Sequence, residues 1–235
     1  MYTDLMNAPR TARERARLEL TREILATARR QLGEVGPTNL SLRAVARELG
    51  MASSAIYRYF KSRDELLTAL ILEAYNDVGA AAEGADDPAA EPGERWTAIW
   101  RAVREWALAN RHEFALLFGT PVPGYAAPQE TATAAGRMPL VLAAVIADAK
   151  AAGALEPLPA PACDPACIDE GLAPLLSDVE FSADEIARIL LAWNRLVGIV
   201  SYELHGHLKG VTADDAGFFD YTARASGVFA GLRLA

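Results

Sequence analysis

The sequence predicts an all-α protein, and three observations lead to this class. Apolar residues recur at intervals of three and four along almost the whole chain, as they do on one face of an amphipathic helix. Two segments open with a Ser-x-x-Glu pair, which caps a helix N-terminus. No segment shows the alternation of apolar and polar residues expected of a half-buried strand, and no internal repeat is found.

The N-terminal part of the chain reads as four helices separated by short breaks. Gly33, Gly36 and Pro37 end the first helix, and Gly50 closes the second at a tight turn. Ser62 opens the fourth helix, with Glu65 three residues on as its capping partner. The expected helices cover residues 11–34, 42–49, 52–60 and 62–84.

The rest of the chain reads as five more helices and one long irregular loop. The loop, residues 153–174, holds five of the thirteen prolines and both cysteines. The expected helices cover residues 96–107, 113–118, 138–152, 182–207 and 213–233. At 235 residues and 51% hydrophobic, the chain is long enough for two cores. We expect an N-terminal three-helix domain at 11–70 and a larger helical domain at 71–235.

The charge of the chain is divided unevenly between these two parts. The net charge is −8, which by itself argues against a nucleic-acid partner. Residues 1–65, however, hold 12 Lys and Arg against 8 Asp and Glu, whereas residues 66–235 hold 11 against 23. A basic N-terminal segment on an acidic body is expected when only one small module meets a polyanion.

Several classes of protein are excluded or disfavoured by what the sequence lacks. No run approaches about 18 consecutive apolar residues, so a membrane-spanning helix is not expected. The first ten residues have no apolar core of a secretory signal, and two cysteines make no disulfide framework, which favours a cytoplasmic protein. There is no nucleophile elbow, phosphate loop or metal-ligand cluster, so we expect no enzyme and no cofactor. A metal or redox role for Cys163 and Cys167 is the minor alternative.

The informative stretch runs from Ser41 to Leu66 and reads as a helix-turn-helix. Gly50 permits the positive φ of the turn, and the small Ala46 allows the two helices to approach closely. The recognition helix must place its first turn against base edges in the major groove, where Ser53 and Ser54 are short and can form hydrogen bonds. The N-terminus at Ser41 can bind a phosphate.

Cationic and phenolic side chains flank this motif, where a phosphate backbone would pass. Tyr57 has an alternative role as a packing residue between the recognition helix and the first helix, and Arg58 has one as a solvated charge. The residues that we expect at the DNA are Ser41, Arg43, Ser53, Ser54, Tyr57, Arg58, Tyr59, Lys61 and Arg63.

Residues 18–70 resemble the DNA-binding domain of TetR-family transcriptional regulators. The resemblance rests on Val-Ala-Arg-Glu-Leu-Gly-Met at 45–51, Ser-Ser-Ala-Ile-Tyr-Arg-Tyr-Phe at 53–60 and Arg-Asp-Glu-Leu-Leu at 63–67. Arg63 stands where the family more often has Lys. The resemblance implies two sets of contacts: phosphate contacts by Ser41, Tyr57, Tyr59 and Arg63, and base contacts by Arg43, Ser53, Ser54 and Arg58.

The remainder is more loosely similar to the C-terminal domains of that family, which bind a ligand and dimerise. The resemblance implies a homodimer formed by the last two helices, whose faces hold more apolar surface than one core needs. The alternative is an intramolecular helical hairpin. We also expect an apolar effector, which is neutral or cationic because the body is acidic. The residues expected to line its site are Trp96, Trp100, Phe114, Phe118, Met138 and Trp193. The alternative is that these residues form ordinary core.

These expectations combine into a cytoplasmic dimeric repressor. It would bind a double-stranded palindromic operator, because one helix-turn-helix reads too few bases for useful specificity, and a small effector would release it. The alternative function is a helical protein-interaction module whose DNA-binding domain is vestigial.

Overall fold

The computed structural model describes residues 11–156, 159–169, 171–172 and 180–233. Within these ranges the chain is helical and contains no strand, which confirms the all-α class. The elements in chain order are α1 (Ala12–Asn39), α2 (Leu42–Glu48), α3 (Ser53–Ile56), α4 (Arg63–Ala85), α5 (Pro92–Ala109), α6 (Arg111–Phe118), α7 (Glu130–Ala151), the 3₁₀ turn η1 (Pro165–Cys167), α9 (Ala183–Leu204) and α10 (Asp215–Ala230).

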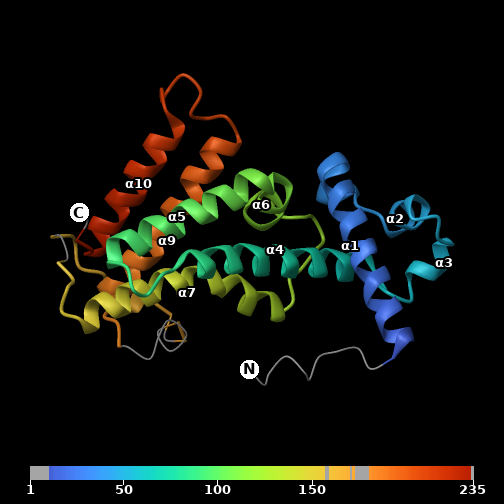
Figure 1. The fold of residues 1–235 in the computed structure, drawn as a ribbon, viewed down its shortest axis with the longest axis horizontal. Helices are drawn as coiled ribbons and strands as arrows, with labels where there is room; N and C mark the ends of the chain where they lie inside the picture. Colours follow the sequence, from blue (N-terminus) through green and yellow to red (C-terminus); the bar gives the residue numbers. More distant parts are fainter. Residues whose placement is uncertain (1–10, 157–158, 170, 173–179, 234–235) are drawn as a thin grey trace.

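The molecule is elongated, with α1, α2 and α3 at one end and the larger helical body at the other (Figure 1). Each end has its own hydrophobic core. The helix α4 contributes to both, because Leu66, Leu67 and Leu70 are buried in the first core and Val78 and Ala82 in the second. A domain boundary after residue 70 would therefore fall inside one continuous helix, and it stays a prediction.

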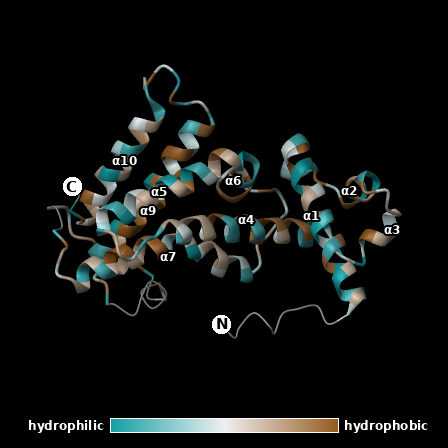
Figure 2. Cartoon of the chain, viewed as in Figure 1, coloured by the Kyte–Doolittle hydropathy of each residue, from teal (hydrophilic) through white to brown (hydrophobic). Residues whose placement is uncertain are grey.

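Apolar residues are spread over one side of most helices rather than gathered in one element (Figure 2). The largest fully buried side chains of the body include Trp96, Trp100, Phe219 and Ile146, which come from α5, α10 and α7. Burying such side chains away from water is the main favourable contribution to folding. The body core thus joins helices that are far apart in the sequence.

Local capping explains where several helices begin. The predicted capping box at Ser182 and Glu185 is confirmed, because each side chain accepts a hydrogen bond from the other's main-chain N–H. At α4 the Ser62 hydroxyl accepts from the N–H of Glu65, as predicted. The Glu65 carboxylate, however, accepts from the main-chain N–H of Lys61 at 2.6 Å rather than from that of Ser62. Only one of the two hydrogen bonds of this predicted box therefore forms.

The recognition helix is shorter than expected. Residues 52–60 were predicted to be helical, but α3 covers only Ser53–Ile56, and the chain continues through turns to Phe60. The first helix, by contrast, ends close to the position predicted from its glycines. Gly36 has a φ of +73° and breaks the regular helix inside α1. Only a short turn at residues 37–39 follows this break.

The helix α7 begins eight residues before the expected position at 138, and Pro139 lies within it. Its early turns are held by burial, because Thr131, Ala134 and Met138 are all buried. By length and hydropathy α7 could cross a membrane, but ten of its residues are buried and it packs against α4, α5 and α9. Its apolar character is that of a core helix.

Candidate nucleic-acid interface

The helix-turn-helix is built by α2, α3 and the turn between them. Gly50 has a φ of +65°, and the N–H of Met51 donates a hydrogen bond of 2.8 Å to the carbonyl of Ala46. Val45, Ala46 and Ile56 are fully buried, so the two short helices approach as closely as their small and aliphatic residues predict. This packing confirms the predicted motif and fixes α3 at the far end of the molecule (Figure 1).

The predicted DNA-binding side chains gather around α3. Tyr57 is 43% exposed, so part of its side chain is accessible for the predicted DNA contact, and its packing role stays the alternative. Ser41 is half-buried and makes no capping hydrogen bond at α2, which leaves its hydroxyl for another partner. Six of the nine predicted residues are exposed: Arg43, Ser53, Ser54, Tyr57, Arg58 and Lys61.

Tyr59 is half-buried against the first core, and its ring lies beside a cation that the sequence did not predict, Arg17. The Arg17 guanidinium lies 5.8 Å from the centre of the Tyr59 ring, and it donates to the carbonyl of Arg58 at 3.5 Å. Arg17 on α1 therefore contacts the turn that follows the recognition helix. Arg17 and Tyr59 are 42 positions apart, so only the packing of α1 against this segment could have revealed the contact.

Arg63 has a structural role beside the one that the sequence predicts. Its guanidinium donates hydrogen bonds of 2.6 Å to the carbonyl of Pro37 and 3.0 Å to that of Thr38. These carbonyls belong to the break at the end of α1, so Arg63 ties that break to the start of α4. Its predicted phosphate contact stays a prediction.

A second missed contact holds α2 on α1. The two carboxylate oxygens of Glu48 accept hydrogen bonds from Arg30 at 2.9 Å and from Gln31 at 2.7 Å. The hydrogen bond from Gln31, followed by that from Arg30, lowers the pKa of Glu48 below its ordinary value. The charged form of Glu48 therefore positions the helix that precedes the recognition helix.

The six predicted effector-binding residues all belong to the core of the body or pack against it, and the five aromatic ones among them form two groups. Trp96 and Trp100 are fully buried and face α10, where Trp100 lies 5.9 Å from Phe219 between ring centres. Phe118 lies 5.0 Å from Phe114 and 5.6 Å from Trp193. Met138 is buried on α7. Their role towards an effector stays a prediction.

The last two helices, α9 and α10, form an antiparallel pair (Figure 1). Two arginines of α5 hold them on the body: Arg104 pairs with Glu203 at 2.6 Å and Arg101 with Asp220 at 2.7 Å. Both helices expose large apolar side chains, and the predicted dimer interface stays a prediction. The exposed side chains are Leu191, Tyr202, Phe218, Tyr221 and Val228.

The histidine pair His205 and His207 lies just beyond the end of α9. This helix ends at Leu204 and the chain turns at Gly206, with a φ of +74°. The ring centres of the two histidines lie 6.3 Å apart. Among the residues that the structure describes, no cluster of His, Cys, Asp and Glu could hold a metal ion, and Cys163 and Cys167 are free thiols.

A two-helix motif with an exposed recognition helix, set on a larger helical body, defines a helix-turn-helix DNA-binding regulator. Family comparisons agree with this class. A model described as bacterial regulatory proteins of the tetR family matches residues 24–70, and one described as the Tetracyclin repressor-like C-terminal domain matches residues 96–226. The chain belongs to the TetR family of transcriptional regulators.

Individual relatives resemble the chain over most of its length. The HTH-type transcriptional regulators Rv1816 of Mycobacterium tuberculosis and Mb1846 of Mycobacterium bovis are each 38% identical over 220 residues, covering 90% of this chain and 92% of the relative. The crystal structure of the regulatory protein SCO4313 has 34% identity and a TM-score of 0.71, covering 92% of this chain and 98% of that one. A Rhodococcus sp. RHA1 protein of unknown function has 27% identity and a TM-score of 0.65, with coverages of 90% and 93%. The relatives with an assigned role are regulators and not enzymes.

Proposed function

We propose that the protein is a cytoplasmic homodimeric repressor that binds a palindromic operator and is released by a small apolar effector. The observation that carries this proposal is the outer face of α9 and α10. Tyr221 is 67% exposed and stacks on Phe218, with ring centres 6.4 Å apart. A groove lined by Tyr221, Ala225 and Val228 runs beside these rings and can receive apolar side chains of a second copy.

The proposed effector site lies where α6 meets the body. Phe114 and Phe118 of α6 pack with Trp193 in the body core, while Leu116, between them on the same helix, packs against the core of the DNA-binding unit. The connection after α6 is also held on α4, where Tyr125 and Thr68 share a hydrogen bond of 2.9 Å between their hydroxyls. A ligand that displaced Phe118 would therefore move a helix that supports both cores.

Analytical ultracentrifugation tests the dimer. Tyr221→Asp and Phe218→Asp are expected to give monomers, because each places a charge in an apolar interface. Leu18→Asp is the matched control, since Leu18 is also exposed and apolar, at 46%, but lies on α1. A wild-type monomer at tens of micromolar, or equal dimerisation by all three variants, would contradict the proposed interface.

Fluorescence anisotropy tests the regulator. The probe is the DNA upstream of the protein's own gene, titrated at two salt concentrations with scrambled DNA beside it. Tight binding of two protomers, lost in a Ser53→Ala/Ser54→Ala double variant, supports the repressor. Weak binding to both DNAs, unchanged in the double variant, would support the alternative of a vestigial DNA-binding domain. Neutral and cationic apolar compounds are then screened for displacement of the complex.

A further inference from the structure

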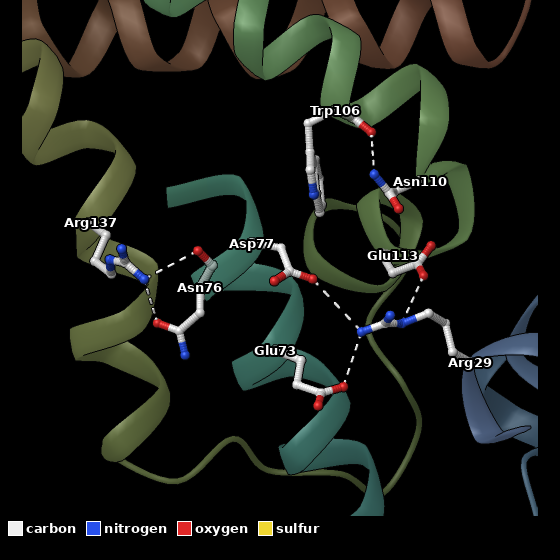
Figure 3. Close-up of polar contacts among 8 residues, drawn as sticks. All are labelled: Arg29, Glu73, Asn76, Asp77, Trp106, Asn110, Glu113 and Arg137. Carbon is white, nitrogen blue, oxygen red and sulfur yellow. Dashed lines mark hydrogen bonds and ion pairs between the residues drawn. The ribbon is translucent and has the colours of Figure 1, made fainter. Parts of the chain in front are cut away.

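We propose that Arg29 is the residue that positions the DNA-binding unit on the body. Its guanidinium meets three carboxylates from two helices of the rest of the molecule (Figure 3). The distances are 3.0 Å to Glu73 and 3.7 Å to Asp77, both on α4, and 3.2 Å to Glu113 on α6. Arg29 and these three carboxylates are called the Arg29 cluster below.

The Arg29 cluster lies at the junction of the two cores. Ala28, the residue before Arg29, is fully buried in the core of the DNA-binding unit, and Phe114, the residue after Glu113, is buried in that of the body. One turn after Arg29, α1 comes so close to α6 that a Cβ on Gly33 would lie 2.8 Å from the ring of His112. The contact with Glu73 is a hydrogen bond, whereas those with Glu113 and Asp77 are ion pairs. A hydrogen-bonded ion pair is directional, whereas apolar contacts are not, so the cluster can fix an orientation.

The same turn of α1 reaches the helix-turn-helix. Arg30 and Gln31, the two residues after Arg29, both donate hydrogen bonds to Glu48 of α2. A three-residue segment of α1 is therefore tied to the body through Arg29 and to α2 through its next two residues. A shift of α1 against α6 would carry α2 and the recognition helix with it.

The Arg29 cluster is not neutral, because one guanidinium faces three carboxylates. A groove of about 520 Å³ beside it is lined by Arg29, Arg30, Glu34, His112 and Glu113, so water and ions reach the cluster. Glu113 is the most enclosed partner, with its side chain 12% exposed, against 37% for Glu73 and 58% for Asp77. The ion pair between Arg29 and Glu113 is thus the one least screened by solvent, and it joins α1 directly to α6.

A distance measurement in the full-length chain tests the proposal without needing DNA. Spin labels are placed at Arg47→Cys on α2 and Glu105→Cys on α5, both exposed, with Cys163 and Cys167 replaced by Ser. Double electron–electron resonance then gives the distribution of distances between the two units. Arg29→Met and Glu113→Gln are each expected to broaden or shift this distribution by several ångströms.

Arg137→Met is the matched control. Arg137 on α7 pairs with Glu83 on α4 through bonds of 2.9 and 2.6 Å. It also donates to Asn76 on α4, on the side of that helix away from Arg29 (Figure 3). Its loss should leave the distance distribution unchanged. Identical distributions in the parent, Arg29→Met and Glu113→Gln would overturn the proposal, as would an Arg137→Met change equal to theirs.

The consequence for DNA rests on the proposed dimer, in which two recognition helices need a fixed spacing. Arg29→Met should weaken binding to the upstream fragment at least 10-fold, while its binding to scrambled DNA, which needs no fixed spacing, stays within about 2-fold. A parent protein that is monomeric and binds no fragment specifically would refute the proposed function. The resonance result would still decide the role of Arg29.

Discussion

The indole nitrogen of Trp96 donates a hydrogen bond of 3.0 Å to the main-chain carbonyl oxygen of Ala223. Both residues are fully buried, so the bond ties α5 to α10 across 127 positions of sequence. Trp100 lies one turn further along α5 and is also fully buried, but its indole N–H has no acceptor among the described residues. The two tryptophans therefore differ in one buried hydrogen bond.

This difference predicts unequal effects of the same substitution. Trp96→Phe should lower the free energy of unfolding by about 2–4 kcal/mol, from lost volume and a lost hydrogen bond. Trp100→Phe loses similar volume but no hydrogen bond, so its effect should be smaller by about 1 kcal/mol. Urea unfolding of both variants measures the difference. Equal losses would show that the Trp96 bond contributes nothing net.

Lys61 and Arg63 are predicted to affect DNA binding in different ways. Lys61→Ala removes an exposed charge, so it should reduce the slope of log affinity against log salt by about 1 and leave stability unchanged. Arg63→Ala breaks the bonds to Pro37 and Thr38, so it should lower stability by about 1–3 kcal/mol. Anisotropy at several salt concentrations, with urea unfolding beside it, separates the two. An unchanged stability of Arg63→Ala would contradict the structural role of its bonds to Pro37 and Thr38.

The parts of this fold that depend on near neighbours in sequence are predictable. The capping box at Ser182, the turn at Gly50 and the helix break near Gly36 each follow from a few adjacent residues. Buried positions such as Ile56 and Leu66 follow from helical periodicity. The helix-turn-helix was predictable for the same reason, because its whole pattern lies within about 25 residues.

What escaped prediction depends on how distant helices meet. The start of α7 was missed because its first turns are held by burial rather than by a capping signal. Arg29 reads in sequence as one charge on a polar face, and its partners lie 44 to 84 positions away. The second role of Arg63 depends on a break in α1 that comes 25 residues earlier. Each of these features depends on how helices pack in the folded protein, which the periodicity of the sequence does not predict.

Glu48 predicts a pH dependence of the attachment of α2. Because the hydrogen bonds from Gln31 and Arg30 lower its pKa in the folded protein, its stabilising contribution is present at neutral pH. The contribution is lost as the pH falls from about 4.3, the ordinary pKa of a glutamate, through the lowered pKa of Glu48 in the folded protein. Glu48→Gln should therefore be less stable than the wild type at pH 7, with the gap narrowing as the pH falls below about 4.3. Thermal unfolding at pH 7 and at a series of lower pH values measures it, and a constant gap would contradict the assignment.

Glu73 in the Arg29 cluster is predicted to act with the opposite sign. Burial, followed by repulsion from Asp77, raises its pKa in the folded protein despite the opposing effect of Arg29. A carboxyl group whose pKa is raised by folding binds a proton more tightly in the folded state than in the unfolded state. The free energy of unfolding therefore increases as the pH falls through that pKa. Glu73→Gln mimics the protonated form and should be slightly more stable than the wild type at pH 7. The gain should be only a few tenths of a kcal/mol, because the side chain is 37% exposed, and it should vanish below about pH 4.

Urea unfolding from pH 7 to pH 4 measures this gain in the free energy of unfolding, with Glu48→Gln as the variant of opposite sign. A Glu73→Gln protein that is less stable than the wild type at pH 7 would show that attraction to Arg29 outweighs burial and the repulsion from Asp77.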